Sequence, residues 1–143
     1  MTITVIGLPA PQGSKSFRGV SKAGHGIMVE SSRHVKPWRD CVIVAAREVM
    51  IKGGLTAPAF RGPVNVCVTF SLPKPKSAQK RRASYPDRKP DIDKLLRSTF
   101  DGLSSAGVWE DDARVVSVCA YKVFAGEDEL DFPGALIGIH EEL

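Results

Sequence analysis

Two hydrophobic periods interleave along this chain of 143 residues, and their order limits the possible folds more than any other feature. Residues 92–103 carry apolar side chains at the spacing of one helix face, whereas residues 63–72 alternate apolar and polar side chains as a strand does. A second helical pattern begins at Lys36 and ends at Gly53. Three further segments have the pattern of strands: residues 2–8, 115–124 and 134–140.

The predicted order of elements is therefore β-α-β-α-β-β. Strands and helices that interleave and then end in a hairpin favour an α+β fold, a mixed sheet of about four strands packed by two helices. Residues 14–33 mix glycines, basic residues and short apolar pieces, which predicts a long loop or a glycine-rich hairpin. The length and ordinary composition of the chain predict a single domain over residues 1–143.

Cysteine usage and the amino terminus bear on the compartment. Cys41, Cys67 and Cys119 stand far apart among Val and Ala, without a CxxC pair or a histidine at zinc-ligand spacing. We expect them to be small buried apolar side chains in a reducing compartment. There is no signal-peptide pattern, and no apolar run approaches the roughly 20 residues that span a bilayer. These features predict a cytosolic protein without a membrane partner.

Charge is divided unevenly along the chain. Residues 1–90 hold 16 Lys and Arg against 4 Asp and Glu, whereas residues 91–143 hold 4 against 12. A basic part suits a polyanion such as DNA, and a compact acidic group beside it suits a divalent cation. Charge alone leaves open that the imbalance only keeps the protein soluble. No P-loop and no GxGxxG motif follows a strand, so we expect no nucleotide cofactor.

The acidic residues gather in two short motifs, KPDID at residues 89–93 and WEDD at residues 109–112. Carboxylates bind Mg²⁺ or Mn²⁺, hard ions that activate water for phosphodiester cleavage. Residues two apart in a helix point to nearly opposite sides, so Asp91 and Asp93 converge only if Asp91 is the N-cap outside the helix. The first motif therefore predicts a metal site at a helix start.

The second motif can reach the same place. A helix over residues 93–105 is about 18 Å long, and residues 106–112, if extended, span about 20 Å. Asp112 can thus return to the helix start. Asp101 lies about 12 Å further along the axis than Asp93, and it ranks below Asp112 as a ligand.

Each of these residues also has an ordinary structural role. Asp91 is a good N-cap and Asp93 favours the helix dipole. Arg97 can simply pair with Asp93 or Asp101, and the Asp111–Asp112 pair can form a turn. Like charges gathered beside a basic segment nevertheless favour a functional site. In that site Arg97, one turn from Asp93, could hold the scissile phosphate or stabilise charge in the transition state.

Residues 84–122, above all PDIDKLLRSTFDGLSSAGVWEDDARVV, resemble the signature of the RusA family of crossover junction endodeoxyribonucleases, which is common in phages and prophages. A weaker resemblance extends to PQGSK at residues 11–15 and to the pair Trp38–Arg39. The resemblance implies a homodimer that binds four-way (Holliday) junctions by shape, uses Mg²⁺ or Mn²⁺, and nicks two strands symmetrically. A phage-encoded member would act in the cytoplasm of its bacterial host.

The resemblance also assigns residues. Asp91, Asp93 and Asp112 match the metal-binding catalytic aspartates of the family, and Asp111 is a further candidate ligand beside them. Arg97 stands where the family usually has a functional lysine. Lys94 stands where the family usually has Asn, so Lys94 could supply the ammonium group instead.

Residues 74–90 form a basic, proline-rich segment that we expect to be a mobile DNA-binding arm. Its phosphate contacts would position a duplex without reading sequence, and Tyr85 could stack on an unpaired base. Replacing Lys80, Arg81 and Arg82 with Ala should weaken junction binding and flatten its salt dependence. The residues expected to contact DNA are Lys15, Arg18, Lys74, Lys76, Lys80, Arg81, Arg82, Arg88, Lys89 and Lys94.

Two alternatives stay open. The first is a non-catalytic DNA-binding module, in which the aspartates only cap a helix and close a turn. The second keeps the nuclease chemistry but changes the substrate to flaps, replication forks or plain duplex, because no residue by itself announces a four-way junction.

Overall fold

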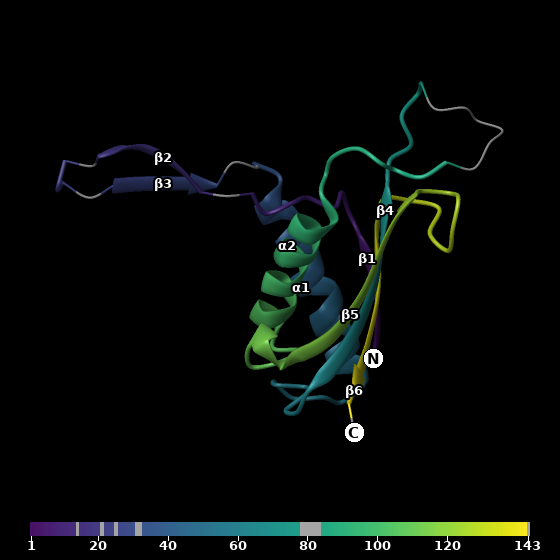
Figure 1. Cartoon of the computed structure of the whole chain (residues 1–143). Coiled ribbons are helices and arrows are strands. Elements are labelled where there is room, and N and C mark those ends of the chain that lie inside the picture. Colours follow the sequence, from purple (N-terminus) through teal and green to yellow (C-terminus); the bar gives the residue numbers. More distant parts are fainter. Residues whose placement is uncertain (14, 21, 25, 31–32, 78–83, 143) are drawn as a thin grey trace.

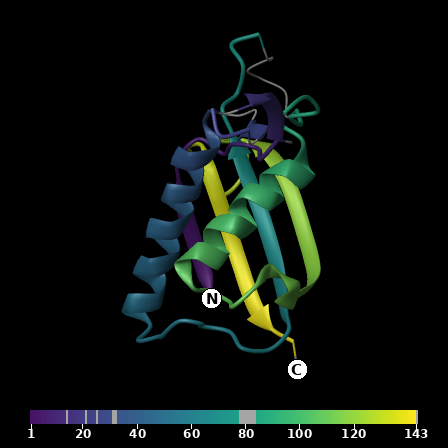
Figure 2. The same ribbon diagram turned by 90° about the vertical axis from the view of Figure 1, so that its left-hand side faces the viewer.

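Strands and helices alternate along the part of the chain that the computed structural model describes, residues 1–13, 15–20, 22–24, 26–30, 33–77 and 84–142. A four-stranded sheet has the order β1-β6-β4-β5. Both helices pack on one face of this sheet (Figures 1 and 2). The predicted mixed sheet with two helices, in the order β-α-β-α-β-β, is confirmed. The elements are β1 (Thr2–Ile6), α1 (Val35–Lys52), β4 (Val64–Leu72), α2 (Ile92–Ala106), β5 (Val115–Phe124) and β6 (Gly134–Glu141).

Strand β4 is the centre of the sheet. Its residues Val64, Val66, Val68 and Phe70 alternate toward the helices and are buried. β4 pairs in parallel with β5 on one side and antiparallel with β6 on the other. The expectation that the last two strands form a hairpin is therefore wrong. The chain after β5 crosses over the end of β4, where the Ala125 N–H donates to the Leu72 carbonyl at 2.8 Å.

The two helices contact each other closely as well as the sheet. The predicted apolar face of α2 is confirmed at Leu95, Thr99 and Leu103, which are fully buried. Small residues complete this face, and a Cβ atom added at Gly102 would lie only 2.9 Å from Val42 Cγ1 of α1. The absence of a side chain at residue 102 thus allows the helices to approach.

Buried polar contacts fix α2 against the rest of the core. The Trp38 indole N–H of α1 donates to Thr99 Oγ1 at 3.1 Å. The Ser98 hydroxyl donates to the Ala10 carbonyl at 2.6 Å. Because these groups are buried, loss of either partner would leave a polar atom without water or protein to bond.

A separate antiparallel hairpin consists of β2 (Lys15–Val20) and β3 (Gly26–Glu30). It extends away from the sheet at the end of the molecule where α2 begins (Figure 1). Of the two structures expected for residues 14–33, the hairpin is the one observed.

The sheet face opposite the helices is open to solvent over the described residues. Cys67 on β4 and Cys119 on β5 are exposed on it, so the expectation of buried cysteines is wrong for both. Cys41 on α1 is half-buried. Among the described residues, neither helix is long and apolar enough to cross a membrane.

Candidate active site and nucleic-acid interface

Asp91 occupies the N-cap position of α2 with an extended backbone, φ −71° and ψ 138°. Asp91 therefore lies outside the helix, at the N-cap position expected from the sequence. The Asp91 side chain makes no capping hydrogen bond. Its Oδ2 atom lies 3.1 Å from Lys94 Nζ, and this hydrogen bond and charge hold the pKa of Asp91 below its usual value. A capping role therefore does not account for this carboxylate, which stays ionised.

Asp93 and Arg97 lie on the first two turns of α2. Both side chains are exposed, and neither forms an ion pair with another described residue. The core-facing side of the helix is apolar at Leu95 and Leu103, so this polar stripe faces solvent. It presents an anionic and a cationic group near Asp91.

Lys122 of β5 holds the segment that leads into Asp91. Its Nζ atom donates to the carbonyls of Arg88 and Pro90, each at 2.9 Å. The charge of Lys122 also lowers the pKa of Asp91 slightly. Sequence reasoning missed this residue. The signal that could have identified Lys122 is its place in β5. The strand positions in the same phase are otherwise apolar, as at Val118 and Ala120.

The amino-terminal motif also reaches this helix start. The backbone N–H of Gln12 donates to the Lys94 carbonyl at 3.0 Å. The Arg39 guanidinium of α1 lies 3.5 Å from Gln12 Oε1. The two weaker motifs noted in the sequence, residues 11–15 and Trp38–Arg39, thus meet at the first turn of α2.

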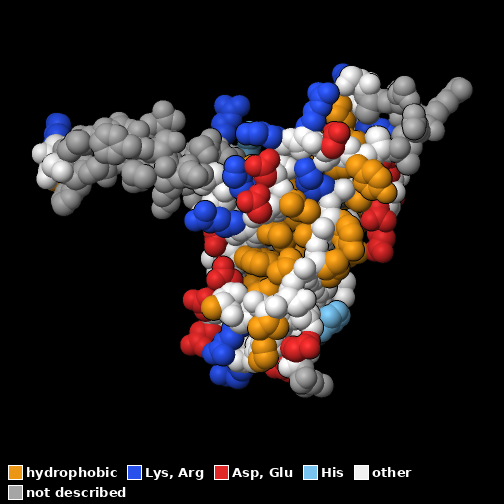
Figure 3. All heavy atoms as spheres, viewed as in Figure 1, with side chains coloured by type: hydrophobic (Ala, Val, Ile, Leu, Met, Phe, Trp, Pro, Cys, Tyr) orange, Lys and Arg blue, Asp and Glu red, His pale blue; other side chains and the backbone are white. Residues whose placement is uncertain are grey.

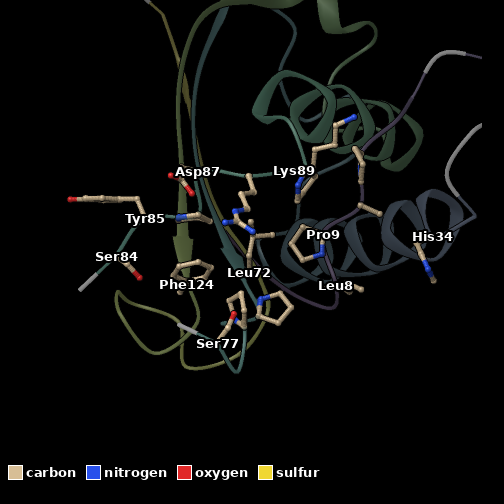
Figure 4. Close-up of a pocket in the computed structure, with 17 residues that line it drawn as sticks. Leu8, Pro9, His34, Leu72, Ser77, Ser84, Tyr85, Asp87, Lys89 and Phe124 are labelled. Atoms are coloured by element: carbon tan, nitrogen blue, oxygen red, sulfur yellow. The ribbon is translucent and has the colours of Figure 1, made fainter. Parts of the chain in front are cut away.

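A cavity of about 920 Å³ opens beside this helix start. Leu72, Phe124 and Pro9 form apolar walls, and Lys89 lies on the side toward α2 (Figure 4). The Tyr85 side chain is 81% exposed and points away from the cavity (Figure 4). Its ring is therefore available to a ligand that lies over this end of the molecule.

Basic side chains surround the start of α2 together with acidic ones (Figure 3). Lys76, Arg88 and Lys89 are exposed, as a DNA contact requires. Two other candidates are already engaged, since Lys94 pairs with Asp91 and Lys74 forms a close ion pair with Glu127. The structure does not describe the remaining candidates: the side chains of Lys15 and Arg18 on β2, and residues Lys80, Arg81 and Arg82.

A second acidic group lies at the start of β5. Asp112 opens a short 3₁₀ turn, η1 (Asp112–Arg114), and Asp111 caps that turn by accepting the Ala113 N–H at 2.7 Å. Partial desolvation raises the pKa of the exposed Asp112, and its interactions with the side chains of Asp111 and Asp101 raise it further. The nearest acidic neighbours of Asp112 are thus Asp111 and Asp101.

The expected return of Asp112 to the start of α2 is wrong. Among the described residues, no group of three His, Cys, Asp or Glu side chains is arranged to hold one metal ion. After α2 the chain does not extend back along the helix, because Ala59 and Phe60 donate their N–H groups to the carbonyls of Gly107 and Val108. β5 consequently begins at the opposite end of the sheet from the start of α2 (Figure 1).

Trp109 anchors this connection. Its side chain is 1% exposed, its indole N–H donates to Ser104 Oγ at 2.7 Å, and its ring meets Phe100 edge to face at 5.7 Å. These contacts place the second acidic motif beside the last turns of α2. Asp101, not Asp93, is consequently the α2 carboxylate whose charge affects Asp112.

Two carboxylates stand at the start of α2 apart from Asp112. Mg²⁺ keeps several water ligands and is commonly bound by one or two carboxylates together with substrate phosphates. Asp91 and Asp93 supply two carboxylates from neighbouring positions at an accessible helix start.

Comparison with known families agrees with the resemblance. A family model described as endodeoxyribonuclease RusA matches residues 8–131, which include the basic segment, α2 and both acidic motifs. No individual curated protein is significantly similar to the chain. Because the match covers nearly the whole chain, this protein belongs to the RusA family of endodeoxyribonucleases.

Proposed function

We propose that this protein is an endonuclease that resolves four-way DNA junctions by paired nicks, with its catalytic centre at the start of α2. The observation that carries this proposal is the position of Asp91. Its backbone has the N-cap conformation, yet its carboxylate is not used for capping and stays ionised beside basic residues. α2 therefore lacks the stabilisation that a side-chain cap would give, and a carboxylate placed in this way is typical of a functional site.

In this proposal Asp91 and Asp93 hold a Mg²⁺ ion, for which Mn²⁺ can substitute. When bound, the ion would polarise the scissile phosphate and lower the pKa of a water molecule. Arg97 binds a nonbridging oxygen of the phosphate from the next turn of α2. Lys94, which pairs with Asp91, would be displaced by a bound ion and would then be available to contact the DNA backbone.

The DNA lies across the end of the molecule where α2 begins. Arg88 and Lys89 contact phosphates, and Lys122 keeps their backbone in place. Tyr85 offers an exposed ring on which a base unpaired at a branch point can stack. These contacts recognise backbone and branch shape and do not read base sequence.

The substrate has two-fold symmetry, so we propose that the active enzyme is a homodimer with one catalytic centre in each subunit. The roles proposed for Asp111 and Asp112 require a rearrangement of residues 107–112, because that segment is paired with residues 59–60. Cleavage by the centre at Asp91 does not require it.

Cleavage of a labelled synthetic four-way junction tests the proposal. A duplex and a flap of the same sequence serve as controls, each with Mg²⁺, with Mn²⁺ and with EDTA. The proposal predicts metal-dependent, paired nicks in the junction and little cleavage of the duplex. Cleavage of the flap or duplex at the same rate would support the alternative of a nuclease that is not selective for four-way junctions. Tight binding without cleavage in either metal would leave only a DNA-binding module.

A further inference from the structure

Cys67 and Cys119 are direct neighbours on the open face of the sheet. They are register partners in the parallel pair of β4 and β5, and both are exposed. Their side chains are close enough for Cys119 to raise the pKa of the Cys67 thiol. The Tyr121 hydroxyl lies 3.2 Å from Cys119 Sγ on the same face. Nothing in the candidate active site uses this group, because α2 covers the opposite face of the sheet.

The spacing of the two cysteines suits a disulfide bond. Neighbouring strands lie about 4.8 Å apart, and disulfides join residues with Cα atoms about 4.4–6.8 Å apart. Register partners in a sheet also direct their Cβ atoms to the same face. Cys67 and Cys119 can therefore be joined while β4 and β5 remain paired. Cys41, on α1, is half-buried and lies against Gly7.

A polar neighbour distinguishes Cys119 from Cys67, because the Tyr121 hydroxyl lies beside the Cys119 sulfur. Partial desolvation and the neighbouring Cys119 side chain raise the pKa of the exposed Cys67 thiol. The hydrogen bond with Cys119 likewise raises the pKa of Tyr121. When Cys119 is a thiolate, the Tyr121 hydroxyl can donate a hydrogen bond to its sulfur. A thiolate, and not a thiol, is the nucleophile in exchange with a disulfide.

We propose that Cys67 and Cys119 are a reversible oxidation site that reacts with small organic disulfides such as glutathione disulfide. The Cys119 thiolate attacks one sulfur of the organic disulfide, forms a mixed disulfide and releases the first small thiolate. Cys67 then gives its proton to the released thiolate, attacks Cys119 Sγ and releases the second small thiolate, which takes a proton from water. Two protein thiols are oxidised to one disulfide, and one organic disulfide is reduced to two thiols. Cys119 is the attacking residue and Cys67 the resolving residue.

Mass spectrometry of the full chain tests this assignment. The protein is reduced, freed of reductant and incubated with excess glutathione disulfide under native conditions. The wild type should lose two hydrogen atoms, carry no glutathione and keep one free thiol, and peptide mapping should join Cys67 to Cys119. Dithiothreitol should restore three free thiols.

Single substitutions separate the two roles. Cys67→Ser removes the resolving thiol, so a stable glutathione adduct should accumulate on Cys119. Cys119→Ser should form no internal disulfide, and Cys41→Ser, the matched control, should behave as wild type. Three free thiols in the oxidised wild type, a disulfide that involves Cys41, or a persistent adduct on wild-type Cys119 would each overturn the proposal. The result does not depend on nuclease activity.

Discussion

The carboxylate of Asp91 and the ammonium of Lys94 lie 3.1 Å apart, so the first acidic residue of the candidate site already has a cation beside it. The pair joins residues three apart at a helix start, and both side chains are partly exposed. A divalent ion that binds Asp91 must displace this ammonium or share the carboxylate with it. In the proposed site, Lys94 would therefore affect metal affinity as well as DNA binding.

Replacing Lys94 with Asn should strengthen metal binding. Because exposed ion pairs are weak, the loss of this pair should lower the Mn²⁺ dissociation constant by only about 1.4- to 5-fold. Titration calorimetry without DNA measures this constant directly. Lys36→Asn, at an exposed ion pair on α1, is the control and should leave it unchanged. Weaker metal binding by Lys94→Asn would show that Lys94 supports the site and does not compete for Asp91.

The raised pKa of Asp112 predicts a pH-dependent gain in stability for Asp112→Asn. An acid whose pKa is raised by folding contributes stability below its ordinary value of 3.8, and that contribution is lost as the pH rises through the raised pKa. At pH 7 the variant should therefore melt about 1–3 °C above wild type, since the site is exposed. The difference should shrink as the pH falls toward 4. Thermal melts that show the variant less stable at pH 7 would contradict this account.

Lys122 is a positioning residue, because it contacts the backbone before Asp91 and not the reacting groups. Lys122→Met should free the carbonyls of Arg88 and Pro90 at a cost of about 1–2 kcal/mol. Trypsin should then cut after Arg88 faster than in the wild type, and kcat for junction cleavage should fall more than KM rises. Lys52→Met, at the end of α1, is the control. Unchanged proteolysis after Arg88 would remove Lys122 from this role.

Arg88 and Lys89 should contribute to the salt dependence of DNA binding. Two phosphate contacts account for a slope of about 1.8 in a plot of log K against log salt concentration. The double variant Arg88→Ala, Lys89→Ala should therefore bind the junction more weakly and with a slope smaller by about 1–2. Binding measured by fluorescence anisotropy over a salt series provides the slope. An unchanged slope would place the DNA elsewhere.

Much of this fold follows from local patterns. The helical spacing of Leu95, Thr99 and Leu103 and the alternation along β4 are local properties, and both predicted the buried faces correctly. Strand pairing is not local. The pattern could not show that β4 accepts β5 and β6 on its two sides, because adjacency in sequence favours a hairpin.

In the candidate site, too, the local feature was predicted correctly and the nonlocal one was not. The N-cap position of Asp91 followed from local geometry and is observed. The position of Asp112 depended on the path of residues 106–112, which pairing with Ala59 and Phe60 decides. The length of residues 106–112 permitted Asp112 to return to the start of α2 but did not require it.

The exposure of Cys67 and Cys119 could have been predicted from the positions of these residues in the alternating pattern of their strands. Cys67 stands in the same phase of β4 as Asn65 and Thr69, opposite to the buried valines. Cys119 stands in the same phase of β5 as Ser117 and Tyr121. Alternation therefore places both sulfurs outward, although cysteine as a residue type is usually buried.

The most direct test of the catalytic centre is the rate of junction cleavage by Asp93→Asn, with Asp128→Asn as the control at an exposed aspartate of the β5–β6 connection. Loss of a metal ligand should slow cleavage by about 100- to 1000-fold, while junction binding persists and Asp128→Asn cuts at the wild-type rate. Wild-type cleavage by Asp93→Asn would contradict a centre at the start of α2.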